Sequence, residues 1–229
     1  MNVDILHQGL FATAEVTLAP GEQFVSESGA LYRGSPNLNI ETSSRALGGG
    51  GILSGLKRAM FARESFFMST YASRDGSPAS FGLSPTLPGE MQVVQLDGAV
   101  NWICAGGSYV GSGTGVTIDT QYQGLVKGLL GGGNLMFMKT SGTGPMLVSG
   151  FGRLIEIEVE GSLTIDNGHL VAFQDSLQFS VTKAAKGWMA SFFSGEMFAC
   201  RFTGKGKLIA QSHSPTAFGG LLGPRLPER

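Results

Sequence analysis

The clearest pattern along the chain is an alternation of apolar and polar residues that occurs three times. Two apolar residues flank a single polar one at Leu38–Ile40, Val116–Ile118 and Leu177–Phe179. Alternation with a period of two predicts a β-strand with one buried and one solvated face. Each alternation lies 16 to 18 residues after a glycine in a polar turn: Gly21, Gly98 and Gly161.

A second landmark follows each predicted strand. It is an apolar run that opens on a polar residue, at 64–68, 134–138 and 196–200. Because the landmarks recur in the same order, we predict a unit copied three times. The expected organisation is one compact domain over residues 1–220, with pseudo-repeats at about 18–95, 96–158 and 159–212 and a C-terminal arm at 213–229.

The most helix-like stretches precede the apolar runs, at 52–61, 125–130 and 188–193. Isolated helices this short are marginal in water, so we expect them to be plugs or connectors held by packing. Many short strands separated by turns favour an all-β sandwich or barrel. We therefore predict a mainly β fold with a few short helices, arranged as a three-fold pseudo-repeated β-sandwich or barrel.

Composition adds an expectation about assembly. The chain has 229 residues, of which 36 are glycine and only 14% are charged, with 16 basic and 17 acidic residues. A net charge of −1 carries no electrostatic footprint of a nucleic-acid binder. A thinly charged surface indicates that copies of the chain cover part of it, so we expect a homo-oligomer.

Cysteine usage and the apolar runs bear on the compartment. Cys104 and Cys200 are far apart and form no Cys-x-x-Cys motif, so we expect two small apolar core residues in a reducing compartment. The N-terminal residues carry no secretory signal, and no uncharged run has the composition of a membrane span. The expected location is the cytoplasm.

Reactive groups are sparse. His7, His169 and His213 have no metal-ligand spacing, and no serine lies in a Gly-x-Ser-x-Gly elbow. Glu156, Glu158 and Glu160 alternate with apolar residues, which predicts the solvated face of a half-buried strand. We expect no catalytic residues, no metal and no cofactor, and hence no enzyme.

Seven residues are interaction candidates. Lys57 and Arg58 follow a run of four glycines, which favours a turn or linker but leaves open an anion site at a helix N-terminus. An enzyme would require a deep pocket that brings Asp166, His169 or Glu196 together. The full candidate set is Lys57, Arg58, Glu64, Asp166, His169, Trp188 and Glu196.

Several of these stretches resemble the altered-inheritance-of-mitochondria-24 family. The resemblance is carried by Gly49–Arg58, Glu64–Phe67, Tyr71, Lys139–Gly144, Val159–Gly161, Ile165–Phe173 and Phe202–Gln211. The chain departs from the family at Gly195–Met197, where members show Gly-Glu-Gly. The resemblance implies a fold like that of the tryptophan RNA-binding attenuation protein, with double-stranded β-helix-like sheets. It implies no known catalytic activity, and eukaryotic members are associated with organisation of the mitochondrial inner membrane; we expect a bacterial member.

The leading functional expectation is a non-enzymatic β-rich scaffold that self-associates and has a protein partner of unknown identity. The alternative is an RNA- or nucleotide-binding module, by analogy of fold, although nucleic acid fits the charge balance poorly. The third is a membrane-associated assembly factor, in which apolar residues such as Leu221 and Leu222 contact a membrane surface peripherally.

Overall fold

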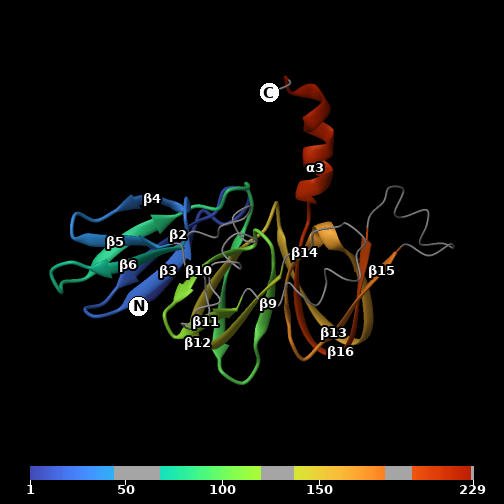
Figure 1. Ribbon diagram of the computed structural model, residues 1–229, viewed down its shortest axis with the longest axis horizontal. Coiled ribbons are helices and arrows are strands. Elements are labelled where there is room, and N and C mark those ends of the chain that lie inside the picture. The colour runs from blue at the N-terminus through green and yellow to red at the C-terminus, as the bar shows by residue number, and fades with distance from the viewer. Residues whose placement is uncertain (44–67, 120–136, 184–197, 228–229) are drawn as a thin grey trace, which may run out of the picture.

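The computed structural model describes residues 1–43, 68–119, 137–183 and 198–227, and these residues are mostly in β-strands (Figure 1). The prediction of a mainly β fold is confirmed. The predicted short helices at 52–61, 125–130 and 188–193 lie outside the described residues. All three alternating patterns lie on strands, although Leu177 precedes its strand by one residue.

The described residues of the first part of the chain form seven strands. They are β1 (Asn2–Leu6), β2 (Thr13–Leu18), β3 (Gln23–Glu27), β4 (Leu31–Gly34), β5 (Leu38–Ser43), β6 (Met68–Ser73) and β7 (Ala79–Leu83). β7 pairs with β2 and β4, and β6 pairs with β3 and β5, all antiparallel. Together β6 and β7 are the partners of β2, β3, β4 and β5, whereas β1 pairs with β2.

The middle part has a single long strand in the same role. Its strands are β8 (Met91–Asp97), β9 (Trp102–Ala105), β10 (Tyr109–Gly113), β11 (Val116–Asp119) and β12 (Phe137–Ser149). β12 pairs antiparallel with each of the other four.

The last part ends in a helix. Its elements are β13 (Leu154–Asp166), the 3₁₀ turn η2 (Asn167–His169), β14 (Leu170–Gln174), β15 (Gln178–Lys183), β16 (Phe198–Gln211), α3 (Pro215–Leu222) and the 3₁₀ turn η4 (Gly223–Arg225). β16 pairs with β13, β14 and β15. The predicted arm at 213–229 therefore contains a short helix, which stands away from the strands (Figure 1).

The described strands form two open sheets. A four-stranded sheet has the order β1-β2-β7-β4, and a 12-stranded sheet follows the path β13-β16-β14-β9-β12-β10-β3-β6-β5. Within the described residues the path does not return to its start, so the barrel alternative is wrong. Along this path the backbone N–H and C=O groups of neighbouring strands are hydrogen-bonded to each other. The strands β13 and β5 stand at its two ends.

Apolar side chains form three clusters, and the second of them lies between the two sheets. The first cluster is centred on Trp102, Cys104 and Met146, and the second on Phe24, Phe81 and Leu83. In the third, Phe173 lies 4.9 Å from Phe202, 5.4 Å from Phe179 and 6.0 Å from Phe137, measured between ring centroids. Burial of these large rings supplies a major part of the hydrophobic driving force.

Two predictions from the sequence are confirmed here. Cys104 and Cys200 are free thiols in the core, and burial raises the pKa of each to about 12. Glu156, Glu158 and Glu160 are exposed along β13, where Lys207 and Lys205 on β16 pair with Glu156 and Glu160.

Candidate functional site

The two described candidates, Asp166 and His169, lie together at the turn η2, beside the point where β16 leads into α3. Asp166 caps η2, because its Oδ1 accepts a hydrogen bond from the backbone N–H of Gly168 at 2.7 Å. His169 donates from Nδ1 to the backbone oxygen of Gln211 at 2.8 Å. Both side chains therefore hold backbone segments in place.

Gln211 completes this polar junction. Its Nε2 donates to the backbone oxygen of Gly168, and its Oε1 accepts from the backbone N–H of Phe151, both at 2.8 Å. The junction thus ties η2, the 150–153 loop and β16 together, directly beneath α3. The polar side chains of this junction are hydrogen-bonded to backbone groups, so their role is to hold these segments together.

Lys57, Arg58, Glu64, Trp188 and Glu196 lie outside the described residues, so the structure does not place them. Of the three residues that an active site would have to bring together, the structure places Asp166 and His169 at one turn. The position of Glu196 is outside the described residues. Across the described ranges, no group of three His, Cys, Asp or Glu side chains is arranged to hold a metal ion.

Sequence reasoning missed a polar groove of about 270 Å³ beside β8. Its walls come from distant segments: Gln92, Gln95 and Asp97 on one side, and Glu156, Gln174 and Lys207 on the other. Lys207 donates to Glu156 at 2.6 Å, and this contact holds the pKa of the Glu156 carboxyl below its usual range. No sequence motif signals the groove, because only the packing of β8 beside β13 and β16 brings these residues together.

Glu27, at the end of β3, is a half-buried carboxyl. Burial raises its pKa from the usual 4.5 to about 7. Between these two pH values the folded chain holds a proton on Glu27 that the unfolded chain releases. The contribution of the protonated Glu27 to the unfolding free energy is therefore complete below about pH 4.5 and is lost as the pH rises through about 7.

Glu27→Gln is expected to remove this pH dependence, because the neutral amide does not ionise. The variant should match the parent protein near pH 5 and exceed its unfolding free energy by about 1–3 kcal/mol at pH 8. Urea unfolding of both proteins at the two pH values measures the difference. An equal pH slope in the two proteins would contradict the assignment.

Large apolar side chains are exposed near both ends of the chain. Leu10 and Phe11 are 64% and 73% exposed, and Phe218, Leu221 and Leu226 at α3 and beyond it are 43%, 56% and 63% exposed. Backbone hydrogen bonds join these regions, from Ala12 to Gly89, from Glu90 to Gly152, and from His213 to Phe151. Residues 89–90 and 151–152 thus link the two regions, and we call the exposed apolar side chains of both regions together the apolar rim.

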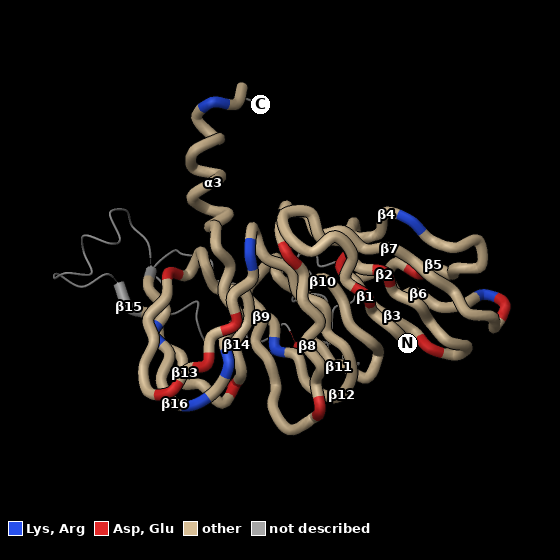
Figure 2. The backbone as a smooth tube through the Cα atoms, turned by 180° about the vertical axis from the view of Figure 1, so that it is seen from behind, with Lys and Arg blue, Asp and Glu red and all other residues tan. Residues whose placement is uncertain are grey.

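The helix α3 is stabilised at its start and contacts the body of the protein through Phe218, whose ring centroid lies 5.1 Å from that of Phe151. Ser214 caps it by accepting from the N–H of Ala217, and Pro215 occupies its first turn. None of its residues is buried and none is charged; the first basic residue after it is Arg225 (Figure 2). In the described part of the chain, no helix is long and apolar enough to cross a membrane.

Comparisons with known proteins agree with this architecture. The family model described as "Mitochondrial biogenesis AIM24" matches residues 3–213. An uncharacterized protein of Streptococcus pyogenes serotype M6 is 29% identical over 221 residues, which cover 95% of this chain and 88% of the relative. A crystal structure of a Streptococcus pyogenes protein superposes with a TM-score of 0.78 at 25% identity, covering 98% of this chain and 99% of that one.

Proposed function

Because this chain belongs to the mitochondrial biogenesis AIM24 family, as its sequence pattern predicted, we propose that it is a non-enzymatic, self-associating β-rich interaction scaffold. The observation that carries the proposal is the open 12-stranded sheet, whose path ends in β13 and β5. An unpaired strand edge is a template for pairing with another chain. Only 14% of the residues of the chain are charged, so electrostatic repulsion between copies is small.

The scaffold in this proposal is a tripled unit, arranged like the tryptophan RNA-binding attenuation protein. Three similar pairing patterns support it: β6 and β7 pair with β2 to β5, β12 pairs with β8 to β11, and β16 pairs with β13 to β15. The register also shifts at a corresponding point in each part, between Leu31 and Arg33, Tyr109 and Gly111, and Leu170 and Ala172. Bulges of this kind recur when a local design recurs.

The hydrogen bonds of Asp166 and His169, the described candidates for an acid and a base, support the non-enzymatic part of the proposal. Asp166 caps η2 and His169 bonds to the backbone of β16, so both are committed to structure. The polar groove beside β8 holds an ion pair between Glu156 and Lys207, in which each charge is neutralised by the other. Such a groove suits hydrogen bonding to a partner better than acid–base chemistry.

Size-exclusion chromatography with multi-angle light scattering tests self-association. We expect a mass that is a multiple of the 23.9 kDa of one chain at micromolar concentration. A mass of one chain up to the highest soluble concentration would contradict the proposal.

Peripheral membrane contact is a second candidate, favoured by the apolar rim. A helix without charged residues that protrudes with exposed Phe218, Leu221 and Leu222 can enter the boundary between lipid headgroups and acyl chains. We expect the parent protein to float with vesicles of mixed neutral and anionic phospholipid, and Leu221→Ser/Leu222→Ser to float at least fivefold less. Ile40→Ser, which removes an exposed apolar side chain on β5, is the matched control. Equal flotation of all three proteins would contradict a role for α3.

A further inference from the structure

Two internal junctions show how one part of the fold adds to the next. β10 pairs antiparallel with β3, placing Gly111, Ser112 and Gly113 opposite Ser26, Val25 and Phe24. β14 pairs antiparallel with β9 in the same way, placing Ala172, Phe173 and Gln174 opposite Cys104, Ile103 and Trp102. In both junctions, the strand that contains the register shift, β10 or β14, lies against an early strand of the preceding part, β3 or β9.

The remaining members of this pattern, β4 and the end of β13, each have a neighbour on one edge only among the described strands. β4 corresponds to β10 and β14, because its register shift places Arg33 where they have Gly111 and Ala172. The end of β13 corresponds to β3 and β9: Ser26, Cys104 and Ile165 each lie five residues before the first residue of the next strand. Among the described strands, β4 pairs only with β7, and β13 only with β16.

Burial supports this correspondence. The three residues on each side of the β10–β3 junction are all buried, as are Trp102, Ile103 and Cys104. At the equivalent positions of the open strands, Arg33, Gly34 and Thr164 are exposed. The open ends therefore expose residues whose counterparts are covered at both internal junctions.

The backbone directions at the two open edges are compatible. Ser35 donates its N–H to the oxygen of Ser80 at 2.8 Å, next to the pairing of β4 with β7. Because successive residues of a strand face opposite edges, Gly34 directs its N–H and C=O away from β7. Arg153 accepts from the N–H of Ser212, and the register of β13 with β16 is unshifted. Arg153 and every second residue after it, up to Ile165, therefore face β16. Thr164 lies between two of these residues, so it directs its N–H and C=O away from β16.

We propose that β4 of one copy pairs antiparallel with the end of β13 of a second copy, with Gly34 opposite Thr164 of the partner subunit. Two separate arguments select this pair. The correspondence with the internal junctions places Arg33 opposite Ile165 of the partner subunit, and hence Gly34 opposite Thr164 of the partner subunit. The backbone directions single out the same two residues as those with outward N–H and C=O groups.

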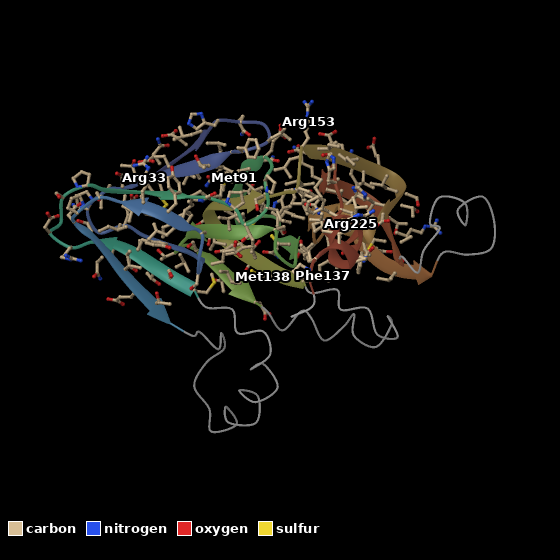
Figure 3. All side chains as sticks on the ribbon, turned by 90° about the horizontal axis from the view of Figure 1, so that it is seen from above. Arg33, Met91, Phe137, Met138, Arg153 and Arg225 are labelled. Carbon is tan, nitrogen blue, oxygen red and sulfur yellow. The ribbon has the colours of Figure 1, made fainter. Side chains whose placement is uncertain are left out.

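The second copy is the occupant because the two edges cannot meet within one chain. β4 lies toward one end of the molecule and β13 toward the other (Figure 1). Figure 3 likewise shows Arg33 well apart from Arg153, which directly precedes β13. The contact uses two different surfaces, so it is head-to-tail, and each added copy presents a fresh edge. Such contacts close into rings or continue as filaments.

Thr164→Pro tests this surface within the self-association proposed above, on which it rests. Proline removes the outward N–H of residue 164 and leaves the bonds from β13 to β16 in place. We expect at least a tenfold weaker association by light scattering over a concentration series. Glu158→Pro is the matched control: it alters an outward N–H of the same strand, outside the predicted contact, and should associate like the parent protein. Circular dichroism of both variants verifies that they are folded.

Cysteine cross-linking tests the register. Arg33 and Ile165 of the partner subunit would form a non-hydrogen-bonded pair, whose Cα atoms in antiparallel sheets lie about 4.5 Å apart, within disulfide reach. A mixture of Arg33→Cys and Ile165→Cys proteins should form a disulfide-linked dimer under mild oxidation, and a mixture of Arg33→Cys and Glu158→Cys should not. Both native cysteines are buried and so do not compete.

The outcomes separate the two proposals. Oligomers that form the Arg33–Ile165 disulfide and are weakened by Thr164→Pro support this interface. Oligomers that are unaffected by Thr164→Pro and form no such disulfide overturn the interface but leave self-association intact. A chain that is monomeric at every concentration overturns both.

Discussion

Phe173→Ala is expected to lower the unfolding free energy by about 3–5 kcal/mol. Phe173 is fully buried on β14, and its ring packs against Phe137, Phe179 and Phe202. Alanine leaves a cavity between strands that are hydrogen-bonded on both sides, because β14 pairs with β9 and with β16. These paired strands cannot move together to fill it.

Urea unfolding at a fixed protein concentration measures this effect, since association itself would change the apparent stability. Phe173→Leu is the control: it keeps most of the apolar volume and should cost much less than the alanine variant. Equal costs for leucine and alanine would show that lost ring contacts, rather than the cavity, dominate the effect.

Gly111→Ala should lower the unfolding free energy by about 3 kcal/mol, the upper end of the range for overpacking. An added Cβ would lie 2.4 Å from Cε1 of Phe24 and 2.8 Å from the backbone oxygen of Val25. The second contact is with backbone in the paired strand β3, so relief requires β10 and β3 to separate. The β10–β3 junction thus depends on a glycine at this position.

Gly113→Ala is the matched control, on the same strand and at the same junction. Its added Cβ would come no closer than 3.4 Å, to the side chain of Pro145, which is an ordinary van der Waals contact. Thermal unfolding of both variants should show a clear loss for Gly111→Ala and a change within about 0.5 kcal/mol for Gly113→Ala. A similar loss in both would indicate that strand flexibility, not close approach, explains the glycine.

The strand pattern was readable from the sequence because apolar alternation reports local geometry. Leu38, Val116, Ile118 and Leu177 are buried as the alternation predicts. Ile40 is 45% exposed, and it lies on β5, the strand that ends the larger sheet. Alternation predicts which face of a strand is apolar, but whether that face is covered depends on neighbours that are distant in sequence.

The candidate site was less accessible to sequence reasoning. Asp166 and His169 stood out as titratable groups at a turn, and the structure engages both in backbone contacts around η2. The helix α3 was expected only as an arm, although Ser214 and Pro215 are ordinary signals for a helix start. Two glycines within its eight residues weaken that signal, because glycine is a poor helix former.

By itself, the sequence determined the family, the predominance of strands and the solvated glutamate face of β13, since these depend on residue order and on periodicity within single strands. Only the tertiary structure decided that β8 borders a polar groove and that, among the described strands, the sheets are open and β4 and β13 each keep a free edge. These features depend on which strands pair across long separations in the chain. Backbone hydrogen bonds between distant strands carry no residue-specific signal, so no local pattern of side chains could have revealed them.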